Sequence, residues 1–372
     1  MIIKNISIFD EDKKFHFGSL SIKNGVFSEH FDPDDEVIDG GGAYAVPGLI
    51  DLHFHGCMGH DFCDGTPEAI RGIAEYEASV GVTSIAPATM TLPVGQLEDI
   101  LAAAAAYDNA SGAHLVGINM EGPFISAEKK GAQDPTNIIP CSTEIFYRFQ
   151  KAADGLVKFI GIAPEKEGAL AFVDEVRKEV SVSLAHTNAG YDDAKAAFDH
   201  GARHVVHLYN AMPAFSHRSP GVVGAAFDSQ HVMAEMICDG VHIHPSMIRA
   251  AFEMFGPDRL ILISDSMRAT GLEDGHYTLG GLDVDVQGNR AVLSSDGALA
   301  GSVTNLADCL RVAVKDMGIP LEDAVACATI NPARALKIDD KYGSIASGKV
   351  ADLILLDKEL ELQKVILNGS LL

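Results

Sequence analysis

The sequence predicts an α/β protein built on a (β/α)8, TIM-like barrel, with a small β-sandwich domain formed from both chain termini. Three observations support this class. Apolar, β-branched segments alternate with helical segments through the middle of the chain. The two ends are instead rich in short alternating strands. Reactive side chains collect where the apolar segments end, which is the catalytic end of such a barrel.

Both ends of the chain have the same β-rich character. Residues 1–44 contain short alternating runs that end in Asn, Gly or Asp, and the last stretch repeats this pattern. Chain termini often lie close together. We therefore expect 1–44 and 338–372 to form one small β domain, and 45–337 to form the barrel.

The barrel strands are predicted from segments that are apolar along almost their whole length. Strands covered on both faces have this composition. Eight such segments occur, at 48–56, 82–89, 114–122, 157–164, 181–188, 204–211, 232–240 and 259–266. Eight strand–helix repeats favour a closed barrel over an open sheet.

The helices between these strands carry recognisable start and stop signals. Thr66 is a helix cap, Pro67 suits a first turn and Gly81 suits a helix end. Residues 192–201 and 244–256 follow the same logic. A β-hairpin insertion is expected near 275–300, followed by a last helical region at 303–336.

Composition and charge exclude several classes of protein. Hydrophobic residues make up 47% of the chain, enough for a large core, and the net charge of −24 argues against nucleic-acid binding. No uninterrupted apolar stretch has the length of a membrane span, and the first residues do not resemble a signal peptide. The six cysteines are scattered without a CxxC pair, which indicates reduced thiols and a cytoplasmic location.

Potential metal ligands fall at the carboxyl ends of the predicted strands. Taken singly, each has an ordinary explanation, because a lone His is usually a core residue and an Asp at a strand end is often a helix cap. Their joint position on one rim indicates a site for zinc, iron, cobalt or manganese. The potential ligands are His53, His55, Glu121, His186 and His207, and one aspartate, Asp265, lies on the same rim.

The loops at this rim add candidate substrate contacts. The segment 207–224 contains Asn210, His217 and Arg218. Arg suits two-point binding of phosphate or carboxylate, although spacing alone does not distinguish this role from that of a solvated surface residue. His242 falls near the rim after the seventh strand, whereas His244 is placed to cap the next helix. No glycine-rich nucleotide motif and no GxSxG elbow are present.

At these positions the sequence resembles the amidohydrolase superfamily and, within it, the N-acetylglucosamine-6-phosphate deacetylase family. The resemblance covers essentially the whole chain. It is carried by PGLIDLHFHG, MEGPF with KKGAQDP, SLAHTNAGYDDAKAAFDHG, HLYNAMPAFSHRSPGVVG, CDGVHIHP, SDSMRATG, LAGSVTNL, NPARALKI and GSIASGKVADLILLD.

The resemblance implies a homodimeric enzyme that hydrolyses an amino-sugar phosphate, N-acetylglucosamine 6-phosphate, with one or two divalent metal ions, most often zinc. Subunits of this family can complete each other's substrate pocket. By motif, Glu121, His186 and His207 match the main metal site, His53 and His55 a second one, and Asp265 the catalytic acid/base. The substrate positions that match are Asn210, Ala211, Arg218, His242 and, in the KKGAQ motif, Gln133.

Gln133 departs from the family pattern, since many members have a histidine there. A glutamine donates hydrogen bonds but cannot carry a positive charge. We hypothesise that a second ion on His53 and His55 offsets this change.

Three other functions are weighed. The nearest is N-acetylgalactosamine-6-phosphate deacetylation, which sequence motifs do not separate from the first. A ring-opening amidohydrolase for cyclic amides is disfavoured by the KKGAQ and HLYNAMPAF blocks. A non-catalytic sugar-phosphate-binding protein is disfavoured by the presence of Asp265 and all the metal ligands.

Overall fold

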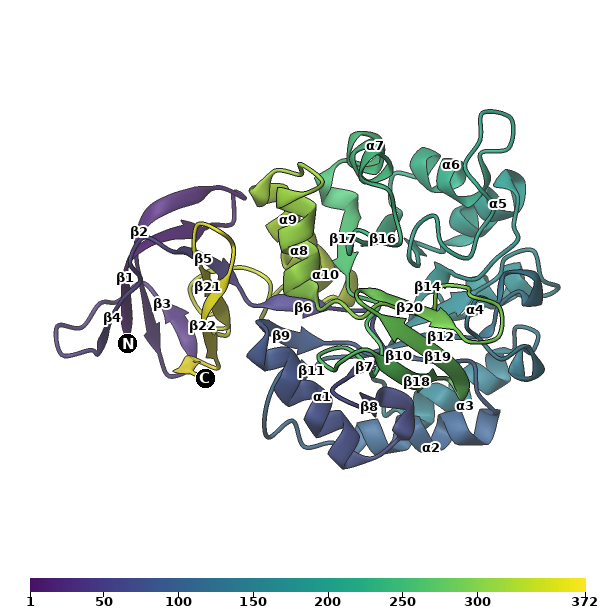
Figure 1. Cartoon of the computed structure of the whole chain (residues 1–372), viewed down its shortest axis with the longest axis horizontal. Helices are drawn as coiled ribbons and strands as arrows, with labels where there is room; N and C mark the ends of the chain where they lie inside the picture. Colours follow the sequence, from purple (N-terminus) through teal and green to yellow (C-terminus); the bar gives the residue numbers. More distant parts are fainter.

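Parallel strands occupy the middle of the chain in the computed structural model, which describes residues 1–372 (Figure 1). The parallel strands form two sheets, with the orders β10-β12-β13-β14-β15-β16-β17 and β11-β9-β6. Two of the predicted strands contribute to both sheets. The second predicted strand is split into β9 and β10, and the third into β11 and β12. The bounds are β6 Leu49–Asp51, β9 Val82–Ile85, β10 Ala88–Thr89, β11 His114–Leu115, β12 Ile118–Phe124, β13 Val157–Ile162, β14 Ser181–Leu184, β15 His204–Val205, β16 Met233–Ile237 and β17 Leu260–Ile263.

The first and last of these strands, β6 and β17, are joined just beyond their carboxyl ends. The backbone N–H of Asp265 donates to the carbonyl of His53 at 3.0 Å, and that of His55 to Ser266 at 2.7 Å. The buried Asp51 carboxylate strengthens this seam by accepting the backbone N–H groups of His53 and Ser264. The arrangement is consistent with the predicted TIM-like barrel.

Helices follow the strands and cover them (Figure 1). Thr66 caps α1 through its side chain, as predicted, and α1 ends at Ser79, two residues before Gly81. The predicted last helical region contains three helices, α8 to α10. The bounds are α1 Pro67–Ser79, α2 Val94–Ala105, α3 Thr143–Ala152, α4 Ala169–Val176, α5 Tyr191–His200, α6 Gly221–Asp228, α7 Pro245–Phe255, α8 Leu306–Lys315, α9 Leu321–Ala328 and α10 Ile330–Leu336, with 3-10 turns at Phe62–Asp64, Ala127–Lys129, Pro135–Asn137 and Pro257–Arg259. No helix is both long and apolar enough to cross a membrane.

Strands from both ends of the chain form one sheet, at the left of Figure 1 where the two termini lie. Its order is β23-β22-β21-β5-β1-β2-β3, with β4 paired to β1. This continuous pairing does not confirm the predicted sandwich, and the division into domains stays a prediction. The bounds are β1 Ile2–Phe9, β2 Phe15–Lys23, β3 Val26–Ser28, β4 Val37–Asp39, β5 Tyr44–Pro47, β21 Leu353–Leu356, β22 Leu362–Leu367 and β23 Ser370–Leu371.

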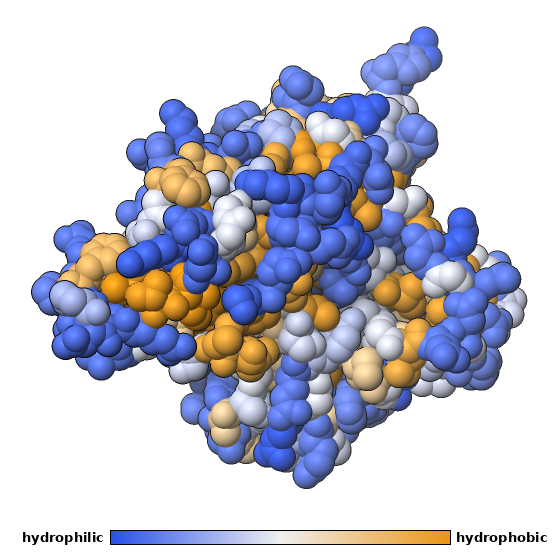
Figure 2. All heavy atoms as spheres, turned by 60° about the vertical axis from the view of Figure 1, so that its left-hand side comes forward, coloured by the Kyte–Doolittle hydropathy of each residue, from blue (hydrophilic) through white to orange (hydrophobic).

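The terminal sheet has a separate small core and a mixed outer surface. Ile3, Ile6, Ala45, Leu353 and Leu355 pack together in this core. Figure 2, in which the terminal sheet comes forward, shows apolar side chains interspersed with polar ones on this side of the molecule.

The insertion near 275–300 contains one more strand than a hairpin. β18 Gly275–Leu279, β19 Leu282–Gln287 and β20 Arg290–Leu293 form a three-stranded antiparallel sheet. A second small pair, β7 Gly56–Cys57 with β8 His60–Asp61, follows β6.

Candidate functional site

Three of the predicted metal ligands and the predicted catalytic aspartate occupy equivalent positions in the fold. His53, His186, His207 and Asp265 each lie two residues beyond the last residue of a strand, namely of β6, β14, β15 and β17. The backbone φ is 43° at His186, 28° at His207 and 50° at Asp265. Such left-handed values are uncommon outside glycine and cost about 1–3 kcal/mol each. The predicted strands are therefore too long at their carboxyl ends, because the strand pairing stops and the chain turns before it reaches these residues.

Glu121, on β12, holds the first group of potential ligands together. Its Oε1 lies 2.9 Å from Nε2 of His186 and 2.9 Å from Nε2 of His207. These two ring nitrogens are themselves 3.2 Å apart. All three side chains are buried.

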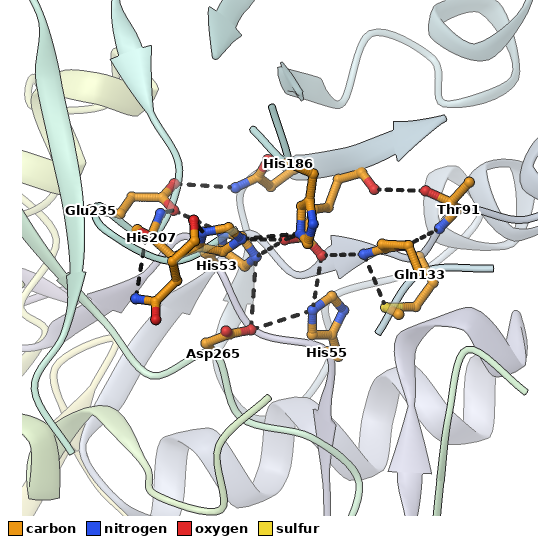
Figure 3. A network of polar contacts seen from close by, with 12 residues as sticks. His53, His55, Thr91, Gln133, His186, His207, Glu235 and Asp265 are labelled. Atoms are coloured by element: carbon orange, nitrogen blue, oxygen red, sulfur yellow. Dashed lines mark hydrogen bonds and ion pairs between the residues drawn. The ribbon is translucent and has the colours of Figure 1, made fainter. Parts of the chain in front are cut away.

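His53, His55 and Asp265 form the second group beside it (Figure 3). Nε2 of His55 lies 3.4 Å from Oδ1 of Asp265 and 3.3 Å from Oε2 of Glu121. Nε2 of His53 lies 3.4 Å from Oε1 of Glu121. The carboxylate of Glu121 thus lies between the two groups. Its Oε1 faces His53 and its Oε2 faces His55.

The hydrogen bonds of the outer ring nitrogens show that the first group fits a metal cation. Nδ1 of His186 bonds the carbonyl of Lys129 at 2.9 Å, and Nδ1 of His207 bonds that of Asn210 at 3.2 Å. Carbonyls only accept, so both Nδ1 atoms donate, and in the neutral ring each Nε2 then carries a lone pair. Three electron-pair donors then converge here, an arrangement that a bound cation stabilises. Ligand atoms about 2.0–2.2 Å from zinc are separated by roughly 3.3–3.6 Å at tetrahedral angles, close to these contacts.

The second group also fits a metal cation. Nδ1 of His53 bonds Oε2 of Glu235 at 2.8 Å, while its Nε2 is buried without a hydrogen-bond partner. Burial opposes protonation of His55, but Asp265 and Glu121 outweigh it and raise the pKa of His55 to about 10. The site is therefore negative enough to hold a cation, and a metal ion would displace protons from these rings.

A cavity of about 180 Å³ opens beside both groups. The predicted residues that line it include His55, Glu121, Gln133, His186, His207, Asn210, Ala211, His242 and Asp265. Asp239 holds His242, accepting from Nδ1 at 2.7 Å. The structure also adds Met90, and Leu279 and Leu299 from the insertion near 275–300.

Arg218 and His217 do not reach this cavity. Both are exposed in the loop before α6, and neither lines the cavity. His244 caps α7, as expected, by accepting from the backbone N–H of Ser246.

The amide of Gln133 is directed at the metal-ligand groups. Nε2 donates to Oε2 of Glu121 at 2.7 Å, and Oε1 accepts from the backbone N–H of Thr91 at 2.6 Å (Figure 3). Gln133 is buried, and its amide connects Glu121 to the chain after β10.

Sequence reasoning missed Glu235, which is fully buried on β16. Its Oε1 lies 2.8 Å from Nε2 of His204, and its Oε2 accepts from His53 and from the backbone N–H of His207. The bonds to His53 and to His207 thus fix one residue of each group. The available signal was a single acidic residue inside the apolar run VMAEMIC.

Comparisons with known proteins agree with this geometry. Residues 44–372 match the model of the amidohydrolase family. An N-acetylglucosamine-6-phosphate deacetylase of Bacillus subtilis is 35% identical over 100% of this chain and 96% of its own. An N-acetylgalactosamine-6-phosphate deacetylase of Escherichia coli O157:H7 is 34% identical over 87% of this chain and 86% of its own.

A solved structure extends the similarity to three dimensions. It is a mutant N-acetyl-D-glucosamine-6-phosphate deacetylase from Mycobacterium smegmatis in complex with N-acetyl-D-glucosamine-6-phosphate. It superposes with a TM-score of 0.93 at 31% identity, over 100% of this chain and 98% of its own. On this evidence the chain belongs to the amidohydrolase family, in the branch that contains the amino-sugar-phosphate deacetylases.

Proposed function

We propose that this protein is a metal-dependent deacetylase that hydrolyses N-acetylglucosamine 6-phosphate to glucosamine 6-phosphate and acetate. The observation that carries the proposal is the pair of ligand groups that meet at Glu121, on the wall of a cavity that also contains Asp265. Full-length relatives with this activity in their names support it. A non-catalytic binding protein would need neither the ligand set nor the buried carboxylate of Asp265.

The residues around the cavity divide the chemistry between them. Glu121, His186 and His207 would hold one divalent ion, and His53 and His55 a second. When bound, such an ion supplies Lewis acidity, which makes water easier to deprotonate and an amide carbonyl easier to attack. Zinc suits the imidazole and carboxylate donors, as do iron, cobalt and manganese.

Asp265 is the acid/base of the proposed reaction. Its carboxylate takes a proton from water as the water oxygen bonds the acetyl carbon. It then gives that proton to the nitrogen as the C–N bond breaks, so that a neutral amine and acetic acid leave, and the acid loses its remaining proton to solvent to become acetate. Burial opposes ionisation of Asp265, but His55 and His53 lower its pKa and keep it in the basic form.

Recognition of the sugar phosphate involves His242, Asn210 and Ala211 at the cavity and Arg218 from outside it. Because Arg218 is exposed away from its own cavity, we infer that it reaches the phosphate in a second copy of the chain. Phe215 and Met247, exposed by 42% and 36% near the same loop, provide apolar surface for such a homodimer.

The galactose epimer is the second candidate substrate, favoured by the 34% identical relative that bears its name. Acetate release from both 6-phosphates and from unphosphorylated N-acetylglucosamine, with and without a chelator, tests both proposals. Chelator-sensitive release that is fastest from N-acetylglucosamine 6-phosphate supports the first. Preference for N-acetylgalactosamine 6-phosphate supports the second, and no release from metal-loaded protein contradicts both.

Three further points belong to the proposal. The eight strand positions form one closed barrel, completed at the seam between β6 and β17. The strands of 1–44 and 338–372 form a separate domain beside the barrel of 45–337. The enzyme acts in the cytoplasm.

A further inference from the structure

A second polar cavity lies at the opposite ends of the strands. It has a volume of about 150 Å³ and is bounded by α10 and by the start of β14, β15 and β16. The first residues of these three strands, Ser181, His204 and Met233, all line it. His186 and His207 lie just beyond the carboxyl ends of β14 and β15, so the two cavities lie at opposite ends of these strands.

Four cationic side chains surround this cavity without a single acidic one. They are Arg177, Arg203, Arg334 and Lys337. The chain has 52 acidic residues against 28 Lys and Arg. Even so, none of the four forms an ion pair, whereas Arg148, Arg268 and Arg311 all do. Four unpaired cations around one cavity repel one another, and an anion between them would remove that repulsion.

Helix ends explain part of this arrangement. Arg177 caps the carboxyl end of α4, and Arg334 and Lys337 lie at that of α10, where cations are favourable. Arg203 has no such explanation, because it immediately precedes β15. Nor do helix ends explain why cations from three separate segments converge on one cavity.

Two contacts define the geometry of the cavity wall. A Cβ built on Gly201 would lie 2.7 Å from Cδ of Arg177, so that side chain crosses Gly201 closely. His204 is only 1% exposed, and its Nε2 is bonded to Glu235. The other ring nitrogen of His204, Nδ1, has no hydrogen-bond partner within the protein.

We propose that this cavity is a binding site for a small phosphate-bearing anion, either orthophosphate or a phosphate monoester. Arginine forks match the paired oxygens of a phosphate, and lysine adds a point charge. The tetrahedral oxyanion would lie between the arginines, with the Ser181 hydroxyl and the His204 ring at the cavity wall. This site is independent of the deacetylase reaction.

Calorimetric titration of the metal-loaded protein with orthophosphate, and separately with glucose 6-phosphate, tests the proposal. The double variant Arg203→Ala/Arg334→Ala should bind the preferred anion at least tenfold more weakly than the wild type. Arg148→Ala/Arg311→Ala, which removes the same charge from ion pairs elsewhere, should bind it as the wild type does.

The comparison between the two double variants decides the outcome. Equal affinity in the wild type and Arg203→Ala/Arg334→Ala would overturn the proposal, and so would an equal loss in both variants. Arg148, Arg203 and Arg334 are exposed and Arg311 is half-buried, and thermal unfolding of each variant checks that the fold is retained. Acetate release, measured separately, reports on the proposed deacetylase function, so failure of one proposal does not imply failure of the other.

Discussion

Gln133 donates a 2.7 Å hydrogen bond from Nε2 to Oε2 of Glu121, the carboxylate that lies between the two ligand groups. The opposite end of the same amide accepts from the backbone N–H of Thr91. Both functional atoms of Gln133 are therefore used in fixing Glu121. A residue expected to contact the substrate acts, in this structure, on the carboxylate beside it.

Replacing Gln133 by Ala should therefore weaken metal binding. Partners of metal ligands typically contribute 10- to 100-fold in affinity, and we expect a loss in that range. Chelator competition on purified protein measures it. Gln287→Ala, on the exposed edge of the insertion, is the matched control. Unchanged metal affinity in Gln133→Ala would show that Glu121 does not depend on this bond.

Asp265→Asn should nearly abolish turnover while metal stays on Glu121, His186 and His207. An amide cannot take the proton from water, and a positioned acid/base typically contributes about 10²–10⁴-fold in rate. Acetate release and metal content, measured on the same sample, separate these effects. Asp285→Asn on β19 serves as the control. Substantial activity in Asp265→Asn would remove the role assigned to this residue.

The double variant His53→Ala/His55→Ala tests the second ion. If two ions bind, the metal content should fall by one per chain and the rate should fall with it. Elemental analysis after gel filtration measures the first quantity. His16→Ala/His276→Ala removes two exposed histidines and should change neither. Full metal content with a normal rate in the first variant would exclude a second ion on these residues.

Mixing two inactive variants tests whether Arg218 acts across a dimer. Arg218→Ala lacks the phosphate contact and Asp265→Asn lacks the acid/base, so each homodimer should be inactive. A mixed dimer would contain one complete site, with Asp265 from one copy and Arg218 from the other. Recovery of activity after subunit exchange is the expected result. Failure to recover, with exchange verified by mass spectrometry, would place Arg218 in its own subunit's site.

Glu77 should make stability decline as the pH rises. It is fully buried on α1, and neither carboxylate oxygen has a hydrogen-bond partner. Burial, with a smaller contribution from Asp51, raises its pKa well above the usual value. Between the unfolded pKa near 4.5 and the raised folded pKa, the folded state therefore binds more protons than the unfolded one. Over that window this group costs up to about 1.4 kcal/mol of stability per pH unit.

Glu77→Gln removes the charge and should remove that decline. Its free energy of unfolding relative to the wild type should be higher at pH 8 than at pH 5, as measured by urea unfolding. Glu75→Gln, on the exposed side of the same helix, should show no such trend. Parallel pH profiles for Glu77→Gln and the wild type would mean that Glu77 ionises normally in the folded protein.

Local patterns in the sequence were sufficient to place the strands and the reactive residues. Apolar segments such as 157–164 and 181–188 contain β13 and β14, since buried strands need little more than apolar, β-branched residues. Glu121 and His186 converge as expected because parallel strands end on the same side. The roles assigned to these residues remain predictions.

Features that depend on distant contacts were not predictable. The left-handed turns at His186, His207 and Asp265 have no local signature, because none of the three is a glycine. The direction of the Gln133 amide depends on Thr91, and the role of Glu235 depends on His53, both far away in the sequence. The exposure of Arg218 was not predictable, because the loop before α6 is long enough to direct this side chain either toward the cavity or toward solvent.

The terminal sheet has a consequence for biosynthesis. β5 pairs with β1 on one side and with β21 on the other, and residues 48–352 separate β5 from β21. On the ribosome, β5 therefore keeps an open edge until nearly all of the intervening chain has emerged, and open edges invite pairing with other chains. The parallel strands can pair during translation, whereas the terminal sheet cannot be completed until β21, β22 and β23 have been made. Nascent chains stalled before residue 353 should consequently depend most on chaperones that cover exposed strands.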